Sequence, residues 1–206
     1  LTRPIASLLI ARRFPHIVIG HPSDVRLNWV DTDHTLGGRI ACEHLIDCGC
    51  ERLAFMGEGE TAGISNQRLT GFRTALLEAG LEYRRDWVLH TDGTLASGKG
   101  AALELLGRGE LPQGIVCGSN LLAYAFTLAG AERGVAIPGD MLLITFDRYP
   151  YSGLISPEPT LVQIDVRDMG RAAAKQLLQG LKKPELRVQS YTTLPSLIEG
   201  QSTRKL

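Results

Sequence analysis

The sequence lacks the features that mark nucleic-acid-binding and membrane proteins. Its 206 residues include 22 basic and 22 acidic side chains, so the formal net charge is zero. A chain that holds nucleic acid by itself needs a concentrated basic face, and this balance argues against such an activity. No apolar run reaches the length that spans a bilayer, and nothing resembles a signal peptide. We therefore expect no membrane partner.

Cysteine is also scarce. Four cysteines in a chain of this length do not form a disulfide framework. Cys42 and Cys117 lie within apolar runs, and we expect both in the core. Cys48 and Cys50 are spaced like half of a metal site, but no second Cys/His pair stands at the spacing that zinc requires. These observations predict a reducing, cytoplasmic compartment and no metal or other cofactor.

Signatures of catalysis are missing too. There is no HExxH or GxSxG motif, and none of the five histidines has an obvious nucleophile partner in the sequence. Residues 93–100, GTLASGKG, come one residue short of the phosphate-loop pattern and lie between a predicted strand and helix. That loop needs a Ser or Thr hydroxyl after its lysine to hold Mg²⁺, but Gly100 follows Lys99. We favour a protein that is not an enzyme; Mg²⁺-dependent ATP binding through Lys99 is the enzymatic alternative.

Apolar strands alternate with helices along nearly the whole chain. With 44% hydrophobic residues, it can bury a core as one large domain or as two small lobes. The alternation predicts an α/β fold with parallel sheets covered by helices on both faces. We predict strands at 16–20, 29–33, 52–57, 87–91, 114–118, 141–147, 161–164 and 186–194. The predicted helices are 4–13, 37–49, 66–79, 96–106, 121–133 and 168–181.

Several predicted strands end in polar residues or glycine. These ends are Gly20-His21, Gly57, Asp92-Gly93, Gly118-Ser119-Asn120 and Asp147-Arg148. Ligands of open α/β sheets bind beyond the carboxyl ends of the strands, so we expect these residues to line a polar cleft at one edge. Asp147 taken alone could equally cap a turn.

Arg68 begins an amphipathic helix just after the strand at 52–57. A guanidinium at such a place can hold a hydroxylated or anionic small molecule through its planar fork of donors. The competing interpretation is an ordinary arginine on the surface of a helix.

An ordered series of segments carries a resemblance that covers essentially the whole chain. The segments are VIGHP (18–22), WVDTDHTLGG (29–38), RLAFMG (52–57), QRLTGFRTALLEAGL (67–81), SGKGAALELL (97–106), CGSNLLAYA (117–125), GVAIPGDMLLITFD (134–147) and LPSLIEGQST (194–203). In this series the chain resembles the ligand-binding core of the lactose-repressor (LacI/GalR) family of bacterial transcription regulators. That core shares its fold with periplasmic sugar-binding proteins.

The resemblance implies two lobes joined by three crossovers, with an effector bound in the cleft. The N-terminal lobe would comprise residues 1–31 and 164–194, and the C-terminal lobe residues 32–163 and 195–206. By similarity, the DNA-binding headpiece and the opening strands and helices of the N-terminal lobe are absent from this chain. Operator DNA would therefore be bound through a headpiece outside it.

The resemblance also assigns effector contacts by position. Arg68 and Asp147 match the family's effector-binding arginine and aspartate, and Ser119-Asn120 falls where many members have Asn-Asp. Thr32 and Asp33 match crossover positions that face the cleft, and His21 stands where an arginine is common. Gly93 takes the place of a Phe or Trp on which a ring stacks in many members. Stacking would then come from another aromatic residue, and the candidates are Trp29, Phe146 and Tyr149.

These expectations describe the effector-binding and dimerisation core of a transcription regulator. The effector would be a sugar or sugar derivative, and its binding would switch affinity for operator DNA. A homodimer is expected because paired headpieces read two half-sites. The predicted interface comprises Leu121, Leu122, Ala125, Leu128, Tyr149, Leu154 and Ile155. Part of this face could instead be core, and for Leu121 and Leu128 the two interpretations are equal. The alternative is a periplasmic-type solute-binding protein of the same fold.

Overall fold

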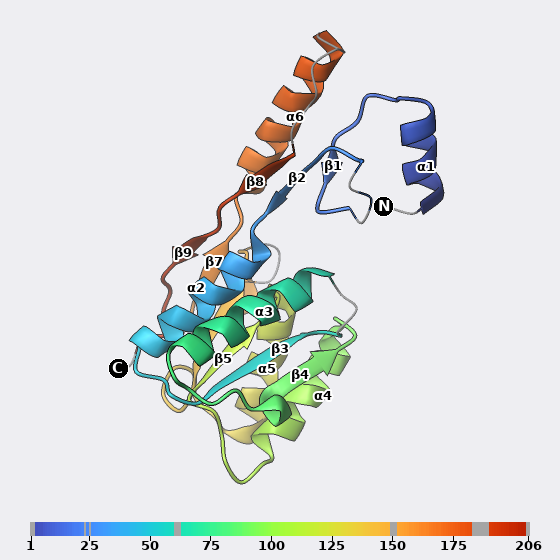
Figure 1. Cartoon of the computed structure of the whole chain (residues 1–206). Helices are drawn as coiled ribbons and strands as arrows, with labels where there is room; N and C mark the ends of the chain where they lie inside the picture. Colours follow the sequence, from blue (N-terminus) through green and yellow to red (C-terminus); the bar gives the residue numbers. More distant parts are fainter. Residues whose placement is uncertain are drawn as a thin grey trace. The chain divides into compact units, whose positions relative to one another are not determined.

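The computed structural model describes residues 3–22, 24, 26–59, 63–148, 152–182 and 190–204 (Figure 1). The chain divides into two compact units. The first unit comprises Leu1–Asp33 and Ile164–Leu194, and the second comprises His34–Gln163 and Pro195–Leu206. Each unit therefore combines segments that are distant in the sequence.

The first unit is built on a three-stranded parallel sheet. Its strands follow the order β1 (Val18–Ile19), β2 (Trp29–Thr32) and β8 (Tyr191–Thr193). The unit also contains α1 (Arg3–Ala11) and α6 (Val166–Lys182), and α6 contacts all three strands. Val30, Ile164 and Met169 form its small buried core. No described helix, α6 included, is both long enough and apolar enough to cross a membrane.

The second unit holds a six-stranded sheet in the order β4-β3-β5-β6-β7-β9. The strands are β3 (Leu53–Glu58), β4 (Val88–Thr91), β5 (Gly114–Cys117), β6 (Leu142–Phe146), β7 (Thr160–Gln163) and β9 (Ser196–Ile198). All pairs are parallel except β7 with β9. Strand β9 was not predicted from the sequence, because its three residues carry no clear apolar run. This antiparallel edge corrects the expectation of a purely parallel sheet.

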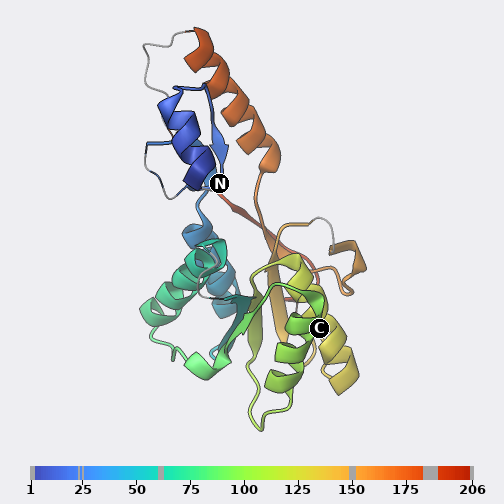
Figure 2. The ribbon, with the colours of Figure 1, turned by 90° about the vertical axis from the view of Figure 1, so that its right-hand side faces the viewer.

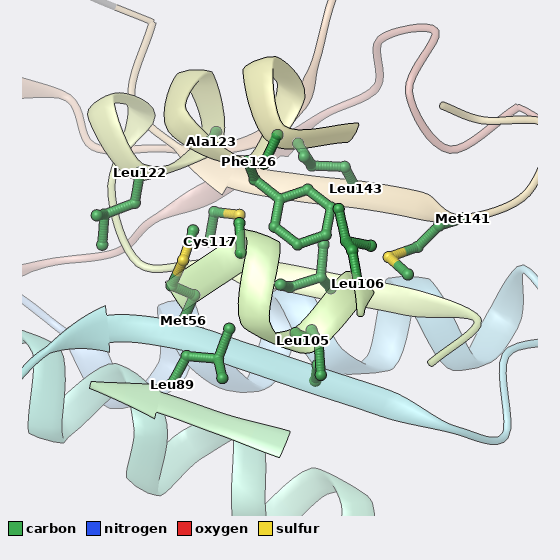
Figure 3. Close-up of a cluster of buried hydrophobic side chains, with 14 of the residues drawn as sticks. Met56, Leu89, Leu105, Leu106, Cys117, Leu122, Ala123, Phe126, Met141 and Leu143 are labelled. Atoms are coloured by element: carbon green, nitrogen blue, oxygen red, sulfur yellow. The ribbon is translucent and has the colours of Figure 1, made fainter. Parts of the chain in front are cut away.

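Helices cover both faces of this sheet (Figures 1 and 2). They are α2 (His34–Asp47), α3 (Gly63–Glu78), α4 (Leu95–Leu106) and α5 (Asn120–Arg133). Short 3-10 turns form at η1 (Arg85–Trp87) and η2 (Ser152–Leu154). The core under α2 and α3 includes Phe55 and Phe72, and the core under α4 and α5 includes Leu105 and Phe126 (Figure 3). Strands β5 and β6 are buried throughout, which explains their continuous apolar sequences.

Part of the predicted dimer face belongs to the interior. Leu122 and Ala125 are fully buried, and Gly98 on α4 packs against both. Figure 3 shows Leu122 within the cluster under α4 and α5, and Ile155 belongs to the same core. Assigning these three residues to an interface was wrong, because their side chains are buried within the unit itself. Tyr149 lies outside the described residues.

Cys42 and Cys117 are buried packing groups rather than reactive thiols. Both are fully buried, as predicted. Burial raises the pKa of the Cys42 thiol to about 12 and that of Cys117 still further. Both therefore stay protonated at neutral pH. Within the described part of the chain, no three His, Cys, Asp or Glu side chains are grouped so that they could hold a metal ion.

Candidate functional site

Polar residues gather at the carboxyl edge of the six-stranded sheet. Strands β3, β4, β5 and β6 run parallel, so the residues that follow them meet at this edge. Gly93, Ser119 and Asp147 lie just beyond β4, β5 and β6. The predicted common edge is therefore correct for the strand ends of the second unit. It is wrong for Gly20-His21, because β1 belongs to the separate sheet of the first unit.

Arg68 lies at the centre of this edge and is buried. Its side chain is 7% exposed, which excludes the alternative of a surface arginine. Nη1 donates a hydrogen bond to the carbonyl oxygen of Gly118 at 2.6 Å, and Nη2 lies 3.4 Å from Nδ1 of His34. Nη2 is also 3.8 Å from Oδ2 of Asp147. A buried guanidinium needs such partners, and together they fix its orientation.

The aromatic ring of Phe146 supports the guanidinium from one side. Cζ of Arg68 lies 3.9 Å from the centroid of this ring, a cation–π geometry. Phe146 is only 1% exposed. The prediction that Phe146 offers a stacking surface to a ligand is therefore wrong, because the ring is buried and faces Arg68.

A close crossing of α2 and α3 fixes the backbone of Arg68. A Cβ atom on Gly38 of α2 would lie 1.9 Å from the carbonyl oxygen of Arg68. A Cβ atom on Gly71 of α3 would lie 1.9 Å from the carbonyl oxygen of Thr35. Both distances are far below van der Waals contact, so only glycine permits the crossing at these positions.

Asp147 is held in an unusual backbone conformation. Its φ of 59° is in the left-handed region, which Asp and Asn tolerate better than other residues with side chains. Its amide donates to the carbonyl oxygen of Val162 at 3.1 Å, and its carbonyl accepts from Nδ2 of Asn120 at 3.4 Å. The side chain is 33% exposed. Neighbouring elements thus hold the backbone while the carboxylate keeps access to solvent next to Arg68.

Ser119 and Asn120 have structural roles at this edge. Ser119 is the N-cap of α5, where its hydroxyl accepts a hydrogen bond from the amide of Leu122. Asn120 is 7% exposed and supports the carbonyl of Asp147. Asn120 therefore helps to position the backbone of Asp147 through this hydrogen bond.

Gly93 lies close to the side chain of Glu58. It has a φ of +81°, and a Cβ atom there would lie 3.1 Å from the Cγ, Cδ and Oε1 atoms of Glu58. An aromatic side chain at this position would strain the backbone and displace Glu58. The structure thus explains why a stacking ring does not fit here. Tyr149, another stacking candidate, is outside the described residues.

Three of the predicted contacts lie in the first unit. Thr32 is buried, and its hydroxyl is 2.5 Å from that of Thr193. The amide of Asp33 donates to the carbonyl oxygen of Thr193 at 3.1 Å. His21 is exposed and packs on Trp29 with ring centroids 4.2 Å apart. Thr193 was not predicted, because nothing in its local sequence distinguishes it from other strand threonines.

His34 is a further functional candidate, which was not predicted from the sequence. It begins α2, is 5% exposed, and places Nδ1 near the Arg68 guanidinium. Its position one residue after Asp33 was a usable signal. It was not predicted, because its contact with Arg68 depends on how α2 approaches the Arg68 side chain in space.

The phosphate-loop alternative fails on geometry. Strand β4 ends at Thr91 and α4 begins at Leu95, with Thr94 as its N-cap, so residues 92–94 alone connect them. Such a short connection cannot wrap around a phosphate chain. Nζ of Lys99 lies on the helix and forms an ion pair with Oε2 of Glu132 at 2.6 Å.

Residues 42–203 match the family model of the periplasmic binding protein-like domain. The repressor PurR of Photobacterium profundum is 26% identical over 170 residues, which are 82% of this chain and 51% of PurR. The regulator CelR of Thermobifida fusca is 30% identical over 178 residues, 85% of this chain and 52% of CelR. The chain thus spans about half the length of these curated relatives. A crystal structure of a LacI family transcriptional regulator from Enterococcus faecium with bound ribose has a TM-score of 0.89 at 25% identity, covering 100% of this chain and 77% of that one.

Proposed function

The chain belongs to the family of periplasmic-binding-protein-like domains, and from this we propose that it is the effector-binding core of a bacterial LacI-type transcription regulator. The observation that carries the proposal is the buried guanidinium of Arg68 beside the partly exposed carboxylate of Asp147 at the carboxyl edge of the sheet. Relatives with regulator names support this function over a transport receptor or an enzyme.

A sugar suits the chemistry of this pair. A carboxylate accepts hydrogen bonds from two neighbouring hydroxyls, and a guanidinium donates two parallel bonds to oxygen. The E. faecium regulator binds ribose, which supports a sugar as the effector class here. We propose that Arg68 and Asp147 contact the sugar directly. Ser119, Asn120 and Gly93 would line the same edge. His21, Thr32 and Asp33 are further proposed effector contacts.

The proposed switch follows from differential affinity. An effector changes operator binding only if it binds two states of the regulator with different affinity. The operator would be bound by a headpiece outside this chain, in a homodimer that works in the cytoplasm. DNA binding would thus be a property of the whole regulator, while this chain would supply the effector site and the dimer interface.

A thermal-shift screen of sugars, sugar phosphates and nucleobases tests the proposed effector class. A sugar at about 100 times its Kd stabilises the folded state by about 2.7 kcal/mol. For a chain of this size that raises Tm by roughly 5–10 °C. A shift with a sugar supports the proposal. If no sugar shifts Tm while a nucleobase does, the proposed effector class is wrong.

The dimer proposal rests on the apolar residues of α5 and η2 that stay accessible. Leu121 and Leu128 are half-buried, two turns apart on α5, and Leu154 of η2 is 62% exposed. We expect Leu128→Glu with Leu154→Glu to convert the dimer to a monomer, because two charges would be buried without partners. Light scattering after gel filtration measures the mass. The control is Leu77→Glu, at a leucine that is 59% exposed on α3. A double variant that stays dimeric would place the interface elsewhere.

A further inference from the structure

A groove on the second unit is separate from the site described above. It occupies about 860 Å³ beside the edge strand β4. Its lining includes Val88 and His90 of β4, Arg73 and Leu77 of α3, and Tyr83 and Arg85 from the segment that precedes β4. The groove exists because α3 packs over β3 and leaves the same face of β4 uncovered at the end of the sheet.

The charge of this groove is positive. Its described lining includes two arginines and a histidine, and no described lining residue is acidic. Within the described part of the chain, neither the Arg73 nor the Arg85 guanidinium forms a hydrogen bond or an ion pair. Other arginines of this unit do form ion pairs: Arg39 with Glu43 and Glu78, and Arg84 with Asp86 and Glu110. The two groove arginines therefore keep their donors available to a ligand.

The groove also offers apolar surface next to these charges. Leu77 is 59% exposed, and Val88 and Tyr83 are half-buried. A guanidinium binds phosphate through two parallel hydrogen bonds. Two arginines with available donors therefore favour a phosphate group as the ligand. We propose that this groove binds a phosphate monoester with an apolar body. The phosphate would lie between Arg73 and Arg85, and the body would cover Leu77 and Val88.

Phenyl phosphate is a suitable probe because it combines both features and has no sugar hydroxyls. Isothermal titration should give a Kd below about 1 mM for phenyl phosphate, and inorganic phosphate should bind about tenfold more weakly because it lacks the body. Arg73→Ala with Arg85→Ala should weaken both ligands by about 30-fold or more, since two charge-assisted contacts are lost. Leu77→Ala should weaken only phenyl phosphate, by a few-fold.

The matched control removes two other positive charges, which lie in the first unit. Arg12→Ala with Arg167→Ala changes two exposed arginines and should leave both affinities unchanged. Circular dichroism of the groove variant checks that it folds. Three results would overturn the proposal: no phenyl phosphate binding to the wild-type chain, equal binding to the groove variant, or equal losses in the control variant. The test does not involve Asp147, so its failure leaves the proposed effector site standing.

Discussion

Asp147→Asn will weaken sugar binding by about 30-fold to 100-fold while the second unit keeps its fold. The substitution removes the charge but preserves the size of the side chain. Charge-assisted hydrogen bonds contribute roughly 1.5–3 kcal/mol each, and an amide can accept at only one of the two places where the carboxylate accepts. Asparagine tolerates the left-handed φ of 59° as well as aspartate does, so the backbone is not strained further.

Arg68→Lys tests the other half of the pair. Lysine keeps the positive charge but loses the planar fork, so it cannot contact the Gly118 carbonyl and a sugar oxygen in the same way. We expect a comparable loss of affinity by titration calorimetry, together with some loss of stability because Arg68 is buried. Asp47→Asn, at an exposed aspartate of α2, is the control and should bind like the wild type. Unchanged sugar affinity in both site variants would refute the assignment of the site.

The regular part of the fold is predictable from local pattern. Strands β5 and β6 are continuous apolar runs because they are buried on both faces, and the helices between strands show amphipathic spacing. Strand β9 was not predictable in this way. Ser196–Ile198 forms a strand because it pairs with β7. Strand β7 ends at Gln163, 33 residues before β9 begins, and no local signal encodes that pairing.

The site was predictable where backbone geometry follows from topology. Asp147 and Ser119 follow parallel strands, and the carboxyl ends of such strands meet at one edge. The roles of His34 and Phe146 were not predictable, because they depend on how α2 and β6 approach the Arg68 side chain. The local sequence around a histidine at a helix start, or around an apolar residue in a strand, is the same whether or not the side chain contacts a guanidinium.

Gly38→Ala and Gly71→Ala will each destabilise the second unit by about 3 kcal/mol or more. Each added Cβ would lie 1.9 Å from a backbone carbonyl oxygen of the other helix, and a backbone atom cannot move aside as a side chain can. Overpacking usually reduces stability by about 1–3 kcal/mol, and contact with rigid backbone puts these two at the upper end. Relief of the contact requires α2 and α3 to separate, so the backbone of Arg68 on α3 would shift relative to α2.

Urea unfolding followed by Trp87 fluorescence measures the effect, because Trp87 is 2% exposed within the second unit. A Trp29→Phe background removes the signal of the first unit. With a slope of about 2 kcal/mol per molar urea, the midpoint should fall by roughly 1.5 M. Gly100→Ala is the control: no atom lies within 4 Å of its added Cβ, so this helical glycine should gain up to about 1 kcal/mol. If Gly38→Ala behaved like Gly100→Ala, the two helices would not cross at backbone contact, and the close support of Arg68 by α2 would have to be abandoned.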